Sequence, residues 1–388
     1  MTQAELVARG ERVLMRNCRR QPLVLTRGEG AKVWDADGRC YYDLIGGVAV
    51  NTFGHAPAFL FRALSAQAER LLHVSNLFYS EQQILAAERL TKAAGMDRVF
   101  FCNSGAEAVE AAIKLARKYG HGRRFGIIAA QGSFHGRTMG ALAATGQLKY
   151  QDDFAPMLTG FSHAPFNDLA AWIAAVTPQT CALLVELIQG EGGVYPADPE
   201  FIRGLDALAR EHGLLLIFDE VQTGFGRTGR MFAWEHYGVK PDIMTAAKGL
   251  GGGFPLGAVM AQEHAAVFEP GDHQSTFGGN PLAAAAVSAC LDELTSERLP
   301  ERAAALGPRI REIITGWGMG ERIKEIRGMG LLIGLEVAGA PAYVGIALEH
   351  GLLLNAVNDH TLRFAPPLNI SEEDLEASLA ILREVLAG

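Results

Sequence analysis

A lysine and an aspartate near the middle of the chain have neighbours that are unusual for charged side chains. Lys248 follows two alanines and runs directly into the glycine-rich segment GLGGGFPLGA (249–258), and Asp219 follows the apolar run LLLIF (214–218). A lysine in an apolar pocket has a lowered pKa, which leaves its amine free to form an imine with a carbonyl. An aspartate buried beside a pyridine ring keeps the ring nitrogen protonated. Together the two residues predict a pyridoxal 5'-phosphate (PLP) site, with Lys248 as the covalent anchor.

A helix start upstream offers a place for the phosphate of such a cofactor. In NSGAEA a strand-like run ends, Ser104 and Gly105 make a turn, and an alanine-rich helical pattern begins at Ala106. The first N–H groups of a helix are unpaired and carry positive potential, so they bind anions readily. A serine and a glycine before a helix are also an ordinary N-terminal cap, so this segment supports the site only together with the other elements.

Further segments carry side chains suited to a cofactor ring and to an acidic substrate. In GSFHGRT, Phe134 is suited to stack on a ring, and Arg137 to hold a carboxylate by two parallel hydrogen bonds. Arg363 in LRFAPPL offers a second such fork, and Glu191 in QGEGG is a candidate partner for it. The ordinary alternatives are a core phenylalanine and solvated or ion-paired arginines. His135 receives no catalytic role.

Two hydroxyl residues precede a turn in STFGGNP. Ser275 and Thr276 stand before Gly-Gly-Asn-Pro, which is a turn motif in its own right. Their hydroxyls are also able to bind phosphate, and a subunit boundary is one place where this would happen. Both interpretations stay open on the sequence alone.

The elements that must position these residues alternate between strand and helix. Apolar runs predict strands at 124–130, 181–188 and 214–220 and a strand followed by a turn at 98–105, and helical patterns lie at 106–120 and 201–212. This alternation predicts an α/β domain with a mostly parallel sheet, whose strands present function at their carboxyl ends.

The regular alternation of strand and helix patterns ends at about residue 282. A helical stretch to about 318 is followed by strand-like LLIGLEV, then by LRFAPPLNI and a terminal helix. We therefore expect a large domain over 56–282 and a smaller α+β domain over 283–388, to which the N-terminal segment 1–55 contributes.

Composition excludes several classes of function. At 388 residues the chain is long enough for about two core-forming units. The net charge of −8 argues against a nucleic-acid or anionic-membrane surface, and no run approaches the roughly 18 apolar residues of a membrane span. The five cysteines are scattered and odd in number, which favours reduced thiols. With no signal peptide recognised at the start, a cytoplasmic location is predicted.

Taken together, these segments resemble the class III (ornithine-type) aminotransferases, PLP enzymes of fold type I. The resemblance runs over nearly the whole chain, and FDEVQTGFGRTG followed by AKGLGGGFPLGA is its most specific part. HVSNLFYS, QGEGGV and the compact length are similar to the acetylornithine branch of that family. The resemblance implies a homodimer with shared active sites.

The resemblance assigns the cofactor contacts residue by residue. It implies that Lys248 forms the Schiff base, Asp219 binds the pyridine nitrogen, Val221 packs on the ring, Gln222 bonds the 3-hydroxyl, Phe134 stacks, Gly105 and Ala106 take the phosphate, and Thr276 reaches the phosphate of the neighbouring subunit. No metal is implied.

The resemblance also implies the substrates. Arg137 and Ser275 would hold an acylated ornithine, and Arg363 would take an α-carboxylate, with Glu191 as its switchable partner. The implied reaction is a ping-pong transfer of the δ-amino group of N-acetylornithine to 2-oxoglutarate, in arginine biosynthesis.

Other donors and other classes remain to be separated. Succinylornithine, N-succinyl-diaminopimelate, ornithine and 4-aminobutyrate aminotransferases carry nearly the same cofactor residues. A more distant alternative is a non-catalytic α/β binding protein. A nucleotide-binding oxidoreductase is disfavoured, because no G-x-G-x-x-G opens a helix after a strand with an acid about 20 residues on.

Overall fold

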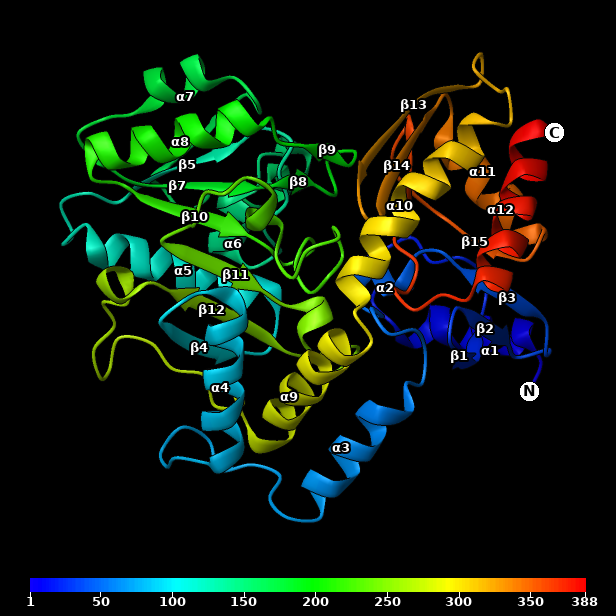
Figure 1. The fold of residues 1–388 in the computed structure, drawn as a ribbon, viewed down its shortest axis with the longest axis horizontal. Helices are drawn as coiled ribbons and strands as arrows, with labels where there is room; N and C mark the ends of the chain where they lie inside the picture. Colours follow the sequence, from blue (N-terminus) through cyan, green and yellow to red (C-terminus); the bar gives the residue numbers. More distant parts are fainter.

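A computed structural model describes the whole chain, from Met1 to Gly388. A seven-stranded sheet lies beside a smaller unit that holds two four-stranded sheets (Figure 1). In order across the large sheet, the strands are β4 (Arg98–Cys102), β12 (Gly257–Ala261), β11 (Ile243–Ala246), β10 (Leu215–Asp219), β7 (Thr180–Glu186), β5 (Gly126–Ala130) and β6 (Phe161–Ala164). Only β12 runs antiparallel to its neighbours. The predicted α/β fold with a mostly parallel sheet is confirmed.

Helices cover both faces of this sheet. Successive side chains of a strand point to opposite faces, so Ile243 packs with α5 while its neighbour Met244 packs in the cluster that holds α4 and α9. One face is covered by α5 (Gly105–Tyr119) and α6 (Met139–Ala144), and the other by α4 (Glu81–Ala94), α7 (Leu169–Ala175), α8 (Pro199–His212) and α9 (Pro281–Ser296). Strands buried on both sides explain the near-continuous apolar runs in the sequence.

Two predicted elements differ from the structure. The run 181–188 was expected to be one strand, but β7 ends at Glu186, and β8 (Ile188–Gln189) pairs with β9 (Tyr195–Pro196) outside the large sheet. The helical stretch after 282 is two helices, because Arg298 adopts a left-handed φ of 50° between α9 and α10 (Leu299–Thr315). The other strands and helices predicted above are present within a few residues of their expected ends.

The smaller unit joins distant parts of the chain. One of its sheets has the order β13 (Ile323–Met329), β14 (Leu332–Val337), β17 (Thr361–Phe364) and β16 (Asn355–Asn358). The other has the order β1 (Leu25–Glu29), β2 (Lys32–Asp35), β3 (Cys40–Asp43) and β15 (Leu352–Leu353), so N-terminal strands share a sheet with a C-terminal one. The helices α11 (Ala340–Glu349) and α12 (Glu372–Ala387) pack on these sheets, and α10 packs on β13 (Figure 1). The domain boundaries at residues 55 and 282 stay predictions.

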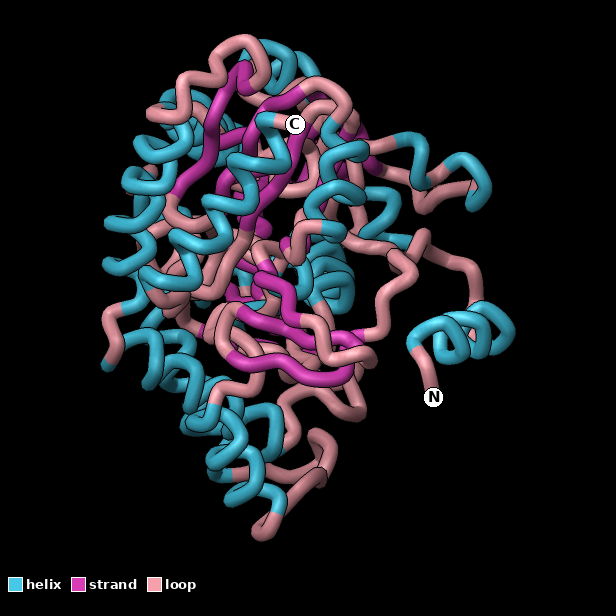
Figure 2. Tube along the Cα trace, turned by 90° about the vertical axis from the view of Figure 1, so that its right-hand side faces the viewer, coloured by secondary structure: helices cyan, strands magenta, loops and turns pink.

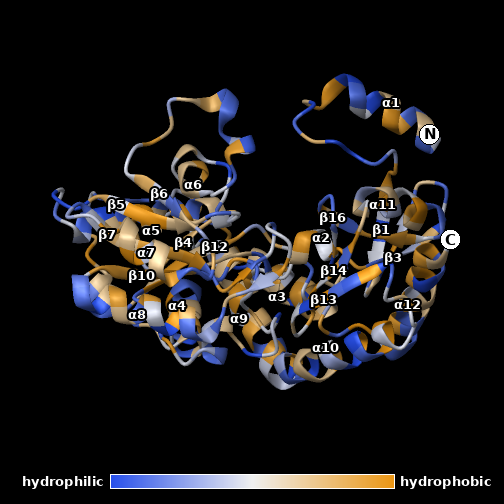
Figure 3. Ribbon diagram, turned by 90° about the horizontal axis from the view of Figure 1, so that it is seen from above, coloured by the Kyte–Doolittle hydropathy of each residue, from blue (hydrophilic) through white to orange (hydrophobic).

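Three helices near the N-terminus remain. Short α2 (Gly46–Ala49) leads towards α3 (Ala58–Ala68), which packs along α9. In contrast, α1 (Gln3–Val13) stands apart from the body of the molecule, and none of its residues is buried (Figures 2 and 3).

Candidate active site

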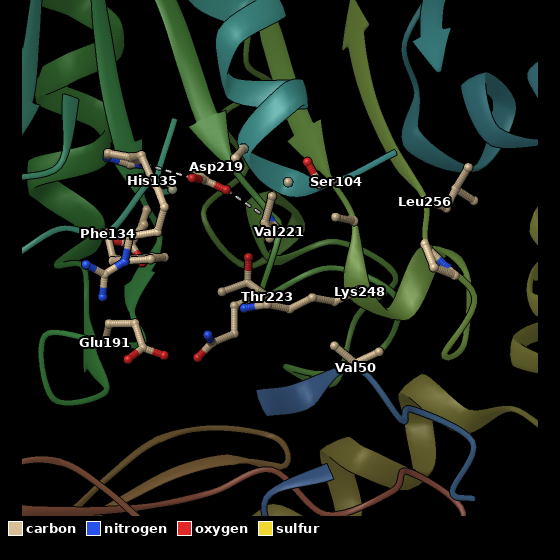
Figure 4. A pocket seen from close by; sticks show the side chains of 18 of the residues that line it. Val50, Ser104, Phe134, His135, Glu191, Asp219, Val221, Thr223, Lys248 and Leu256 are labelled. Carbon is tan, nitrogen blue, oxygen red and sulfur yellow. Dashed lines mark hydrogen bonds and ion pairs between the residues drawn. The ribbon is translucent and has the colours of Figure 1, made fainter. Parts of the chain in front are cut away.

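A cavity of about 480 Å³ opens at the carboxyl ends of the central strands of the large sheet. Asp219 ends β10, and Lys248 begins a short 3-10 turn two residues after β11. Because β10 and β11 are parallel neighbours, their carboxyl ends meet at one edge, which brings these two residues to the same cavity. Figure 4 shows both side chains there, together with Phe134 and Glu191.

The Lys248 amine is in an environment that favours its neutral form. Burial, followed by the nearby charge of Arg363, lowers the pKa of Lys248 to about 8. Lys248 also adopts a left-handed φ of 50°, a conformation that costs a non-glycine residue energy and is concentrated at functional sites. A partly neutral amine that faces a cavity is suited to covalent attachment of a carbonyl group.

Asp219 is held by three hydrogen bonds. Its carboxylate accepts from the backbone N–H of Val221 and the hydroxyl of Thr245, each at 3.0 Å, and contacts Nδ1 of His135 at 2.7 Å. Burial alone would lower the pKa of His135, but the bond to Asp219 and its charge outweigh burial, and the pKa lies above its usual range. These bonds fix the direction in which the carboxylate faces.

The start of α5 lies against the same cavity. Ser104 caps the helix by accepting the N–H of Glu107 at 3.2 Å, while the first N–H groups of a helix have no intrahelical partner. A Cβ on Gly105 would lie 2.8 Å from Cγ1 of Val221, so only glycine lets the helix start approach this closely. Gly105 and Ala106 both line the cavity, and their backbone suits a phosphate.

Glu191 and Arg363 form an ion pair at the other side of the cavity. Arg363 Nη1 donates to Glu191 Oε1 at 2.5 Å, and also to Gln222 Oε1 and Gly190 O at 3.2 Å each. Burial would raise the pKa of Glu191, but the charge and hydrogen bond of Arg363 outweigh it and hold the pKa below its usual range. The second terminal nitrogen of Arg363, Nη2, is buried and has no partner.

Arg137 is an exposed cation on an aromatic support. Its guanidinium lies 4.0 Å from the centre of the Tyr150 ring and 5.3 Å from that of Phe134, and no ion pair engages it. Arg137 is therefore free to meet a carboxylate that enters the cavity.

The position of Phe134 is fixed through its backbone. The backbone N–H of Phe134 donates to Glu186 at 3.0 Å, and burial raises the pKa of that carboxyl group to about 7.

Three residues predicted for the site, Ser275, Thr276 and Arg363, do not line the cavity of their own chain. Ser275 Oγ accepts from Asn103 Nδ2 at 3.1 Å and from the N–H of Gly278 at 3.0 Å, so it touches the lining only through Asn103. Thr276 is exposed. Arg363 reaches the cavity through its partners Glu191 and Gln222. The cavity lining holds the other predicted residues: Gly105, Ala106, Phe134, Arg137, Glu191, Asp219, Val221, Gln222 and Lys248.

Three residues of the site carried no assignment from the sequence. His135, Glu186 and Tyr150 hold Asp219, Phe134 and Arg137, respectively. His135 was visible within GSFHGRT, but its partner follows it by more than eighty positions. Only the order of the strands in the sheet brings such partners together.

Comparison with known proteins identifies the family. The family model for class-III aminotransferases matches residues 14–386. The chain belongs to this family. One relative, the acetylornithine aminotransferase of Caldanaerobacter subterraneus subsp. tengcongensis, is 50% identical over 384 residues, covering 97% of this chain and 98% of the relative. The succinylornithine transaminase of Salmonella paratyphi A is 45% identical over 372 residues, covering 92% and 90%.

Solved structures of the family share the fold closely. The ornithine aminotransferase of Toxoplasma gondii superposes with a TM-score of 0.96 at 35% identity, covering 100% of this chain and 95% of that one. The acetylornithine aminotransferase of Elizabethkingia anophelis gives 0.88 at 35% identity, covering 100% and 99%. A further Toxoplasma gondii structure reports PLP at its active site. Membership of this family makes the chain a PLP-dependent aminotransferase. No helix has the length and hydropathy needed to span a membrane.

Proposed function

We propose that this chain transfers the δ-amino group of N-acetylornithine to 2-oxoglutarate, with PLP attached to Lys248. The observation that carries the proposal is the contrast between two arginines, Arg137 without an acidic partner and Arg363 covered by Glu191. The full-length similarity to acetylornithine aminotransferases supports it.

The residues around the cavity fit the cofactor. Gly105 and Ala106 would hold the phosphate, Phe134 and Val221 the two faces of the ring, Gln222 its 3-hydroxyl, and Asp219 its nitrogen. When bound, PLP supplies an electron sink that stabilises negative charge at the carbon losing its proton. His135 orients Asp219 through the 2.7 Å contact, so the carboxylate stays directed at one place.

Lys248 serves twice at the same atom. Its Nζ would anchor the cofactor. Once the substrate amine has displaced Lys248, the same nitrogen can take a proton from the substrate carbon and deliver it to another atom. A pKa of about 8 suits both tasks, because general acid–base catalysis is most efficient when the pKa lies near the working pH. Burial is the largest cause of that shift, so exclusion of water from the amine is part of the chemistry.

The two arginines separate the two substrates. An acylated ornithine presents one carboxylate and a neutral amide, so Arg137 can hold the carboxylate while Glu191 keeps Arg363 covered. 2-Oxoglutarate presents two carboxylates, and its α-carboxylate would displace Glu191 from Arg363. Free ornithine would add an ammonium beside the Arg137 guanidinium, and two like charges close together repel each other.

The donor is tested by measuring kcat/KM for five amines with 2-oxoglutarate. These are N-acetylornithine, N-succinylornithine, N-succinyl-diaminopimelate, ornithine and 4-aminobutyrate. We expect N-acetylornithine to lead, and Arg137→Ala to lower its kcat/KM by about a hundredfold, as expected for a lost charge-assisted fork of two hydrogen bonds. A lead by N-succinylornithine would favour the function named for the Salmonella relative. A lead by ornithine or 4-aminobutyrate would contradict the acyl donor.

We further propose a homodimer with shared active sites. Thr276 would then reach the cofactor phosphate of the partner subunit. Support comes from an exposed apolar surface beside it, made of Leu71, Leu72, Leu77, Phe78, Tyr79 and Phe277. Asn76 Nδ2 donates to the backbone of Ser275 and Gly278, so this surface is continuous with the turn that carries Thr276. An apolar patch of this kind marks a protein interface.

The dimer is tested by light scattering during activity measurements. We expect the wild-type chain to scatter as a dimer, and Phe78→Asp to give monomers that have lost activity. An active monomer would contradict the shared site. The cytoplasmic location stays a prediction.

A further inference from the structure

The Glu191–Arg363 pair joins two separate pieces of the molecule. Glu191 lies in the loop between β8 and β9, two strands of two residues each, and Arg363 lies in β17 of the smaller unit. Such short strands contribute few hydrogen bonds to hold the loop. Another contact must therefore set how firmly Glu191 rests on Arg363.

Arg327 makes that contact from β13. Its Nε donates to the backbone oxygen of Gly193, in the loop of Glu191, at 2.8 Å. Its Nη2 donates to Oγ1 of Thr361, in the strand of Arg363, at 2.9 Å. One guanidinium thus bridges the two elements that carry the ion pair, and it is buried with 6% of its surface exposed.

The Arg327 side chain is itself held on its other sides. Nη1 donates to Glu325 Oε2 at 2.9 Å and also to Glu336. The guanidinium lies 4.0 Å from the centre of the Tyr195 ring. The planar guanidinium of Arg327 is ion-paired along one edge and stacks on an aromatic ring, so it keeps one orientation. The ammonium of a lysine would not reproduce these contacts.

The loop fits closely against the smaller unit. Gly193 has a φ of 132°, and a Cβ there would lie 3.2 Å from Nδ2 of Asn358 in the smaller unit. A Cβ on Gly334 would lie 2.8 Å from Cβ of Val194. Besides Arg363 itself, which donates to Gly190 and Glu191, Asn358 Nδ2 donates to Gly192 at the longer distance of 3.3 Å. Apart from the ion pair, Arg327 therefore makes the shortest polar contact between this loop and the smaller unit.

We propose that Arg327 is a positioning residue that sets the balance between the covered and uncovered states of Arg363. The proposal rests on the proposed function, since it concerns the two half-reactions of that transfer. With the anchor intact, Glu191 covers Arg363 and the donor binds through Arg137. With the anchor weakened, an uncovered Arg363 captures the α-carboxylate of the donor. The donor then presents its acylated α-nitrogen to Lys248, and this nitrogen cannot react.

The two half-reactions should therefore respond differently. In ping-pong kinetics, kcat/KM for the donor reports the first half-reaction alone, and kcat/KM for 2-oxoglutarate reports the second alone. 2-Oxoglutarate needs Arg363 uncovered, so a looser loop does not impede it. A residue that only supports folding would lower both constants by the same factor.

The test compares the ratio of the two constants in matched variants. In Arg327→Met we expect the donor constant to fall about tenfold relative to the 2-oxoglutarate constant, the size of one charge-assisted hydrogen bond. Thr361→Val, which removes one acceptor of Arg327, should shift the ratio in the same direction by a smaller factor. Glu325→Gln keeps an acceptor oxygen beside Nη1 of Arg327, which also donates to Glu336, so this variant should leave the ratio unchanged.

The possible outcomes are distinct. Equal losses in both constants for Arg327→Met and Thr361→Val would contradict the role of Arg327. If Arg327→Met does not fold, Thr361→Val and Arg327→Lys decide the question by the same ratio. If the wild-type chain accepts none of the five donors, the proposed function is wrong and the role of Arg327 falls with it. If it accepts one and the ratio does not move, only the role of Arg327 is wrong.

Discussion

The edge of the large sheet and the Glu191 loop border one cavity but are built differently. Asp219 ends a strand that is buried along its full length, and three hydrogen bonds hold its carboxylate. Glu191 lies in a loop between two-residue strands, and a quarter of its side chain is exposed. The chemistry common to both half-reactions uses the rigid edge of the large sheet, where Asp219 lies. The contact that must change between the two substrates is made by the Glu191 loop, which can adjust.

The largest effect should come from the rigid side. Lys248→Ala removes the covalent anchor and the proton carrier together, so both half-reactions should slow by at least about 10⁴-fold, the upper range for proton transfer by one group. The absorbance of covalently bound cofactor should disappear as well. Equal losses for donor and acceptor would sharpen the comparison, and retained turnover with either substrate would break it.

Asp219→Asn should also slow both half-reactions, by about 10³-fold. The substitution keeps the shape but removes the charge that pairs with His135 and would face the pyridine nitrogen. Single-turnover rates with the donor and with 2-oxoglutarate measure the two losses separately. A loss confined to one of them would mean that Asp219 belongs to substrate selection.

The pH dependence of cofactor attachment should follow Lys248. Its pKa is lowered from 10.5 to about 8, so about half of the amine is neutral at pH 8, and this reactive form is lost as the pH falls further. The attachment rate of PLP to cofactor-free protein should drop about tenfold per pH unit below 8, because the neutral fraction does. Stopped-flow absorbance measures it, and a rate that is flat between pH 6 and 8 would contradict the shift.

The smallest of these effects should come from the adjustable side. Glu191→Gln removes the charge that covers Arg363, so kcat/KM for the donor should fall about tenfold while that for 2-oxoglutarate is maintained. Asp219→Asn serves as the matched control, since it should lower both. If Glu191→Gln lowers both constants equally, the two sides of the cavity do not differ in the way described.

Local patterns predicted the large sheet well, because each strand carries its own signal. The run LLLIF and the helix ending at Gly213, which adopts a left-handed φ of 59°, are examples. The break at Leu187 was missed, since an apolar run looks the same when its last residues leave one sheet for another. Pairing partners are set by tertiary structure, which periodicity does not report.

The site residues show the same division. Lys248 and Asp219 were predicted from their apolar neighbours and from motifs, and both line the cavity. Arg327 was not, because in IKEIRGM it alternates with other charged residues as on any exposed strand. The contacts of Arg327 to Gly193 and Thr361 depend on how the loop of Glu191 packs against the smaller unit. A role that depends on such packing is seen only in the three-dimensional structure.

The antiparallel strand β12 has a consequence for the order of folding. In the large sheet β4 pairs only with β12, so residues 98–102 must wait for residues 257–261 before they gain a partner. The helix start at Gly105 follows β4 directly, and its position depends on that pairing. On a ribosome, the N-terminal part of the chain emerges first, so the proposed phosphate-binding site at the start of α5 would be assembled late. We expect nascent chains that end before residue 257 to bind no cofactor, which pull-down of stalled chains with labelled PLP would measure.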